Sequence, residues 1–139
     1  MVVVYPVVFT ATHDKKDTYL ICIPDIGGTT QGHGLSNAIY MARDYIGCTL
    51  YEKDDKEFPK ASEKSKIKVS KSIFYKDYPK ENSFVSLVDL DMDSYRKTMN
   101  KKSVRRNVSI PAWLDKKASE AKINVSRVLQ EALIEKLNV

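Results

Sequence analysis

The sequence predicts an α+β protein of two domains: an antiparallel sheet with one helix over residues 1–99, and a strand–helix–helix unit over residues 100–139. Three observations support this class. Segments rich in β-branched and aromatic residues alternate with turn residues in the first half, and apolar residues at helical spacing follow them. The composition then becomes polar and basic near Asn100, where we place the domain boundary.

The overall composition is that of a soluble, folded protein, with 42% hydrophobic and 29% charged residues among 139. No apolar run approaches the roughly 20 residues that span a bilayer, so we expect a cytoplasmic protein without a membrane partner. The apolar segment Met1–Phe9 lacks a basic lead-in and a cleavage site, which favours a strand over a signal peptide. Cys22 and Cys48 lack metal-ligand spacing and are expected to be buried free thiols.

Charge is distributed unevenly along the chain. Residues 1–58 contain five Lys/Arg against eight Asp/Glu, a net charge of −3, whereas residues 59–139 contain 18 against 10, a net charge of +8. Two parts of opposite charge suggest two different partners. The partner of the basic part is expected to be a polyanion.

The first domain is expected to begin with a β-hairpin. Val2–Thr10 and Asp17–Ile23 are both rich in β-branched and aromatic residues, and the polar turn His13–Lys16 separates them. The glycine-rich passage Pro24–Gly34 follows, with room for a short third strand around Thr29–Gln31.

A helix from about Ser36 to about Tyr51 should cover this sheet. Four apolar residues recur there at the period of one helical face: Leu35, Ile39, Ala42 and Ile46. The charged stretch Glu52–Lys71 has little apolar periodicity and is expected to be a solvated connector. Ser83–Asp91 is dense in apolar residues and should add a strand to the same sheet.

The second domain begins with Val104–Leu114, whose alternate residues would form the two faces of a strand. One face is mostly apolar, with Arg106, Val108 and Ile110, and the other is wholly polar, with Arg105, Asn107 and Ser109. Pro111 ends strand pairing and suits the start of a helix. Two helical stripes follow, and Asn124 can cap the second helix.

A unit of about 40 residues with one strand and two short helices buries too little apolar surface to be stable alone. Its single strand also has no partner for its backbone groups. Two copies would meet both needs by pairing their strands into an antiparallel ribbon above a core of four helices. The expected dimer core consists of Val108, Ile110, Trp113, Leu114, Val128, Leu129, Ala132 and Leu133.

The order Val-x-x-Asn-Val-Ser-Ile-Pro-x-x-Leu-Asp, a short helix ending in Ala, and Ile-Asn-x-Ser before Leu-Gln-Glu-Ala-Leu resembles ribbon-helix-helix DNA-binding domains of the Arc/CopG kind. The resemblance implies that the ribbon enters the major groove of operator DNA. Arg105, Asn107 and Ser109 would then contact base edges. The phosphate contacts would come from Lys101, Lys102, Arg106, Asn124 and Ser126.

Two features bear on this resemblance. Lys122 stands where the family often has a glycine that ends the first helix. Strand parity also places Arg106 on the core side of the ribbon, from where its long side chain would have to reach the DNA backbone. The alternative is an edge strand and helical hairpin used only for self-association, with solvated basic residues.

Three motifs in the first domain are similar to the HicB antitoxin family: Tyr5-Pro-Val-Val-Phe, Tyr19-Leu-Ile-Cys-Ile-Pro-Asp-Ile-Gly-Gly and Thr30-Gln-Gly-His-Gly-Leu-Ser-Asn-Ala. The resemblance implies a partial ribonuclease-H-like domain that binds and occludes the small toxin HicA, a ribonuclease with a double-stranded-RNA-binding-like fold. It also implies a carboxy-terminal domain that represses the operon encoding both, as a homodimer able to form larger hetero-oligomers with the toxin. The chain departs from the family at Ile26-Gly27-Gly28, where Pro-Gly-Cys is usual, and in its extended connector.

Acidic residues of the first domain are candidates for contacting the basic surface that an RNA-cleaving toxin needs, and we consider Asp14, Asp17 and Asp25. The same carboxylates could hold the two metal ions of a ribonuclease-H-like reaction. Turn formation explains the first two, and the third follows a proline in a loop. His13 and His33 lie in polar turns without a nearby nucleophile.

We therefore expect no catalytic residue, no metal and no cofactor. The first alternative is a metal-dependent ribonuclease-H-like nuclease with a DNA-tethering tail. A second alternative is a transcription factor whose first domain binds a small effector at the glycine-rich turn.

Overall fold

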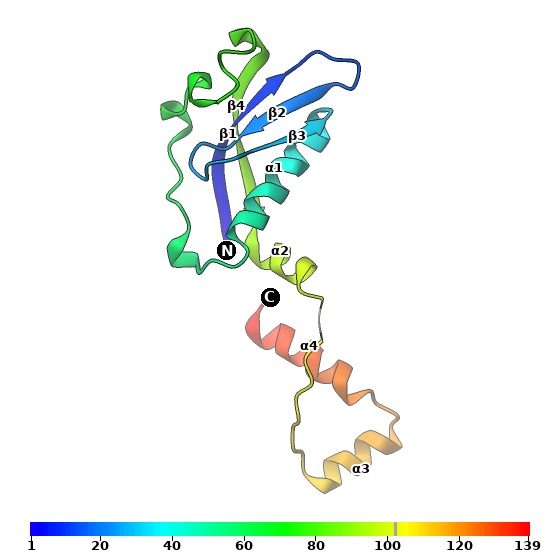
Figure 1. Ribbon diagram of the computed structural model, residues 1–139. Helices are drawn as coiled ribbons and strands as arrows, with labels where there is room; N and C mark the ends of the chain where they lie inside the picture. Colours follow the sequence, from blue (N-terminus) through cyan, green and yellow to red (C-terminus); the bar gives the residue numbers. More distant parts are fainter. Residues whose placement is uncertain (102) are drawn as a thin grey trace. The chain divides into compact units, whose positions relative to one another are not determined.

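The computed structural model describes residues 1–101 and 103–139, which divide into two compact units, residues 1–100 and 101–139 (Figure 1). The first unit is a four-stranded antiparallel sheet with helices, and the second contains two helices. The predicted α+β class is confirmed. None of the helices in the described ranges is both long and apolar enough to cross a membrane.

The sheet of the first unit has the strand order β3–β2–β1–β4, and all neighbours are antiparallel. Its strands are β1 (Val2–Ala11), β2 (Thr18–Cys22), β3 (Thr29–His33) and β4 (Ser83–Asp91). The register runs from Val2 opposite Asp91 to Thr10 opposite Ser83, so β4 joins the sheet beside β1 although the two are far apart in sequence. The predicted hairpin, short third strand and late strand are all confirmed.

Helix α1 (Leu35–Leu50) covers one face of this sheet (Figure 1). Ala42, Ile46 and Leu50 are fully buried in the core beside Phe9 and Ile21. Of the predicted apolar face, Ala42 and Ile46 are buried and Ile39 is partly buried, whereas Leu35 at the start of the helix is 47% exposed. The first turns of α1 pack closely on β3 at Gly32, which has no side chain. A Cβ at this position would lie only 2.7 Å from the Cα of Ala38.

The connector, residues 51–82, covers the opposite face of the sheet, and the expectation that it is merely solvated is wrong. Ile67 is buried and packs with Val8 and Cys22, whose side chains lie on the face away from α1. Isolated apolar side chains of the connector shield these residues from water. They recur with neither a helical nor a strand period, so the sequence pattern did not reveal them. It contains four short 3-10 turns, η1 (Asp55–Glu57), η2 (Lys64–Lys66), η3 (Val69–Lys71) and η4 (Lys80–Asn82).

Helix α2 (Met92–Met99) follows β4 directly and was not expected from the sequence. Its Tyr95 ring packs on Gly47 of α1, where a Cβ would lie 2.5 Å from the ring. The Tyr95 hydroxyl lies 3.0 Å from the Cys48 sulfur. Cys48 is exposed despite this contact, so burial was predicted correctly for Cys22 and wrongly for Cys48.

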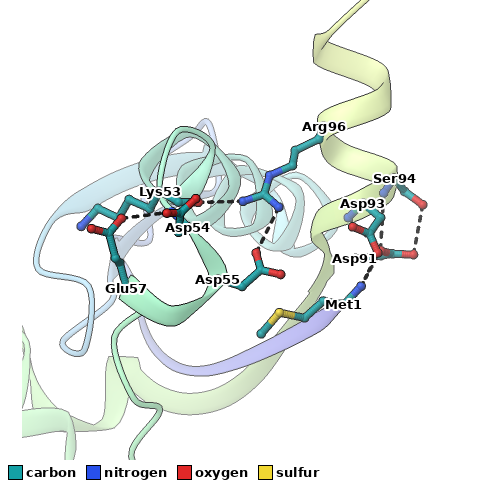
Figure 2. Close-up of polar contacts among 9 residues, drawn as sticks. All are labelled: Met1, Lys53, Asp54, Asp55, Glu57, Asp91, Asp93, Ser94 and Arg96. Atoms are coloured by element: carbon teal, nitrogen blue, oxygen red, sulfur yellow. Dashed lines mark hydrogen bonds and ion pairs between the residues drawn. The ribbon is translucent and has the colours of Figure 1, made fainter.

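Polar contacts attach α2 to the start of the connector (Figure 2). The Arg96 guanidinium donates to the Asp55 carboxylate at 3.1 Å and to the Lys53 carbonyl at 2.9 Å. It also lies 5.7 Å from the centroid of the Phe58 ring. On the other side, the Met1 amino group pairs with the Asp93 carboxylate. These contacts fix α2 although it has only eight residues.

The second unit contains α3 (Ala112–Glu120) and α4 (Val125–Leu137), which confirms the two predicted helices. Between them Lys122 has φ of 54°, a left-handed conformation that favours glycine, so the turn forms despite the lysine. Residues 103–111 are neither strand nor helix in the single chain. A lone strand has no partner for its backbone groups, so the predicted ribbon stays a prediction.

The cap of α2 should make stability depend on pH. The Asp91 carboxylate accepts hydrogen bonds from the Ser94 hydroxyl at 3.0 Å and from the Ser94 and Asp93 amides at 3.4 and 3.1 Å. The Ser94 hydrogen bonds hold the pKa of Asp91 below its ordinary value. A lowered pKa in the folded state stabilises the fold above the ordinary value, and this stabilisation is lost as the pH falls through the folded value.

Asp91→Ala should therefore lower the melting temperature at neutral pH, and the gap to the wild type should narrow below about pH 4. Circular-dichroism melts over the acid range would measure the gap. Asp77→Ala, which removes an exposed connector carboxylate, serves as the control and should show little gap at any pH. A gap for Asp91→Ala that stays constant down to acid pH would contradict this assignment.

Candidate functional site

The segment before α3 presents the side chains that the sequence suggested for DNA contact. Arg105, Asn107 and Ser109 are exposed, as are Lys101 and Arg106. Lys102, a further predicted phosphate contact, lies outside the described residues. Arg106 was expected to lie on the core side of a ribbon, and in the single chain it is exposed like its neighbours.

The start of α4 is built as a helix cap. The Asn124 side chain accepts a hydrogen bond from the Arg127 backbone amide at 3.1 Å. Ser126 is exposed in the first turn. The capping role read from the sequence is confirmed, and the positive end of the helix dipole lies beside these two residues.

An apolar groove runs along the second unit and has a volume of about 340 Å³. Its lining is wholly aliphatic: Val108, Ile110, Leu114, Ala118, Ile123, Val125, Val128, Leu129 and Ala132. Six of the eight predicted dimer-core residues line it. Trp113 and Leu133 do not line the groove. The Lys117 ammonium lies over the Trp113 ring, 5.9 Å from its centroid. Three lining residues were not among those predicted: Ala118 and Val125, which lie on the helical stripes, and Ile123, which falls between them.

This groove leaves the second unit without a closed core. Among its described residues, every side chain except Ala118 and Leu129 is exposed. Val108, for example, is 55% exposed. A monomeric protein rarely leaves so continuous an apolar surface open to water, so the groove is a candidate interface.

The three carboxylates suggested for toxin contact do not lie together. The Asp14 carboxylate accepts from the Thr18 amide at 2.9 Å and the Thr18 hydroxyl at 2.8 Å, which closes the turn between β1 and β2 and lowers the pKa of Asp14. Asp17 is exposed in the same turn. Asp25 lies beyond the far end of β2, where it accepts from the Ser62 amide at 2.9 Å and the Ser62 hydroxyl at 2.6 Å.

The two histidines also have structural surroundings. His33 ends β3, and its Nδ1 lies 3.0 Å from the Thr18 hydroxyl oxygen. His13 is exposed in the β1–β2 turn. Within residues 1–101 and 103–139, no three His, Cys, Asp or Glu side chains gather in a way that could hold a metal ion.

A second groove, which we call the α1–α2 groove, lies between these helices and the end of β4 and has a volume of about 360 Å³. Its lining mixes apolar and charged residues: Tyr40, Arg43, Asp44, Asp89, Leu90, Asp91, Ser94, Tyr95, Thr98 and Met99. The Arg43 guanidinium pairs with the Asp89 carboxylate at 2.8 Å and lowers the pKa of that carboxyl. Sequence reasoning missed this groove because it missed α2, which forms one of its walls.

Comparison with known proteins agrees with this architecture. The sequence model of a family described as HicB-like antitoxin of bacterial toxin–antitoxin systems matches residues 5–133. A chain of a toxin–antitoxin complex from Streptococcus pneumoniae is 30% identical, with 98% of this chain and 99% of that chain covered and a TM-score of 0.59.

The antitoxin HicB of Burkholderia pseudomallei is 22% identical over 96% of this chain and 97% of its own, with a TM-score of 0.38. A search of curated proteins gave no match. The family model spans nearly the whole chain, and both units lie within the match to the streptococcal chain. The chain therefore belongs to the HicB-like antitoxin family of bacterial toxin–antitoxin systems.

Proposed function

We propose that this antitoxin binds and occludes a small HicA-like, RNA-cleaving toxin through its first unit, and represses its own operon by binding DNA as a dimer through its second unit. The observation that carries the proposal is the open apolar groove of the second unit beside an exposed basic and polar segment. The chain has no chemistry of its own in this account, and both partners are met in the cytoplasm.

The groove supports a ribbon-helix-helix dimer. Burying one Val, Leu or Ile side chain contributes about 1.5–3 kcal/mol, so closing a groove lined by several of them favours association. A second copy supplies matching apolar side chains and a second strand for residues 104–110. Both the uncovered apolar surface and the unpaired backbone of that segment are then accounted for by one partner.

Charge supports DNA as the ligand of this dimer. Residues 101–139 contain nine Lys/Arg against four Asp/Glu, a net charge of +5 for each copy. Phosphate neutralisation favours such a surface on DNA. Specificity would come from the ribbon, where Arg105 suits guanine and Asn107 suits adenine. Ser109 is the third base contact, and the amides at the start of α4, beside Asn124 and Ser126, suit a phosphate.

The first unit is left to bind the toxin. Both of its apolar clusters lie within residues 1–100, so it holds a complete core without the second unit. The streptococcal relative was solved in a toxin–antitoxin complex, which supports a toxin partner for this chain as well. The partial ribonuclease-H-like domain then serves as a binding scaffold that covers the toxin.

Removing the second unit tests this division of labour. A chain ending at Asn100 should still neutralise the toxin encoded by the neighbouring reading frame, measured as rescue of growth on co-expression, because its core is intact. It should lose operator binding, measured by mobility shift, because the ribbon is gone. The full-length chain is the control. Specific operator binding by the shortened chain would show that the ribbon is not the DNA-binding element.

Substitutions in the ribbon separate base reading from phosphate contact. Asn107→Ala should weaken operator binding by about 1–3 kcal/mol and relax base preference at one position of each half-site. Lys101→Ala is the matched comparison: it should weaken binding to all sequences and reduce the salt dependence by about one unit of slope. Binding titrations on the operator and on half-site variants at several salt concentrations would measure both. Equal loss on all sequences for Asn107→Ala would contradict a base contact.

A further inference from the structure

The first unit carries opposite charges on different parts of its surface. The later part of the connector is basic: residues 59–82 contain seven lysines against three acidic residues, whereas residues 51–58 contain two lysines against four acidic residues. All seven lysines are exposed, and among the described ion pairs only that of Lys66 with Glu63, at 3.9 Å, involves one of them. This surface should repel a basic protein, so we expect such a protein to bind on the side of the sheet that α1 covers.

The α1–α2 groove on that other side is acidic. Asp44, Asp89 and Asp91 line it, opposed by the Arg43 guanidinium, which pairs with Asp89, and by the Met1 amino group, which lies 3.9 Å from the Asp91 carboxylate. Hydrogen bonds to Asp91 from Ser94 keep the pKa of its carboxyl low, and the Arg43 guanidinium does the same for Asp89. Both therefore remain ionised at neutral pH and give the groove a net negative charge.

The groove also offers apolar surface that this unit does not use. Tyr40 is 63% exposed and Met99 is 50% exposed, and both line the groove. Leu90 and Tyr95 also line the groove and are half-buried. Exposed aromatic residues and methionine around a pocket are enriched where proteins bind one another. The volume of about 360 Å³ suits one or two long side chains of a partner.

We propose that the α1–α2 groove is the docking surface for the toxin, with a lysine or arginine of the toxin seated between the carboxylates and its apolar flank packed on Tyr40 and Met99. This assignment rests on the proposed antitoxin function. An enzyme that cleaves RNA needs a cationic surface for its substrate, and the groove complements that surface.

The alternative acidic contacts are less suited to this role. Asp14 holds a turn and Asp25 holds the connector, and neither lines the groove that contains the exposed Tyr40 and Met99 side chains. Asp25 is also separated from Asp14 and Asp17 by the length of β2. The groove instead gathers three carboxylates and two exposed apolar side chains within one site.

A charge placed in the groove tests the proposal. Tyr40→Lys puts a cation at an exposed position, where it should leave the fold intact and oppose the basic toxin. Ile73→Lys is the matched control, because Ile73 is 68% exposed on the connector. The probe is the small protein encoded by the neighbouring reading frame, purified from the co-expressed complex, and binding to full-length antitoxin is measured by calorimetry.

Tyr40→Lys should raise the dissociation constant at least about tenfold, since like charges opposed at an interface are strongly unfavourable. Ile73→Lys should change it less than about twofold. Met99→Lys is the second groove variant and should behave like Tyr40→Lys. Unchanged melting temperature and operator binding would confirm that each variant is folded.

The outcomes separate this inference from the function on which it rests. If both groove variants bind the toxin as the wild type does, the groove is not the docking surface, while the antitoxin function stands. If Ile73→Lys alone loses binding, the toxin docks on the connector side. If the wild type does not bind the toxin, the proposed function fails together with the groove.

Discussion

The described residues of the second unit leave their apolar side chains uncovered, and the proposed dimer and its DNA binding both depend on that constraint. Two helices and one extended segment surround a groove lined only by aliphatic residues, and nearly every side chain described in this unit is open to water. In the dimer that we propose, a second copy supplies both the missing apolar cover and a partner strand. That proposal makes DNA binding by Arg105, Asn107 and Ser109 depend on the same apolar contact.

The first unit covers its own apolar side chains with elements of the same chain. Its sheet needs cover on both faces, and α1 supplies one while the connector supplies the other through Ile67 and its neighbours. The lysines of the connector make one side basic, whereas α2 and the end of β4 form an acidic groove with α1. A unit that is closed and charged in this way can bind a basic protein without needing a second copy of itself.

Apolar residues and turn residues were enough to predict β1 to β4, α1, α3 and α4 to within a few residues. The short strand β3, which has no apolar residue, was placed by the glycines around it. The connector and α2 could not, because their order comes from contacts between distant residues. Asp25 binds Ser62, 37 positions away, and Arg96 binds Asp55, 41 positions away. For the same reason six of the residues predicted for the dimer core line one groove, because a helical period indicates which residues share a face. Asp14, Asp17 and Asp25 shared only their charge, and they do not lie together.

The mass of the full-length chain in solution tests the central claim most directly. Light scattering coupled to size-exclusion chromatography should give twice the chain mass of 15.8 kDa for the wild type. Val128→Lys, which places a charge in the apolar groove, should give a single chain mass or an unfolded second unit. A wild-type protein that remains monomeric at high concentration with α3 and α4 folded would contradict the dimer, and with it the ribbon on which the DNA-binding account depends.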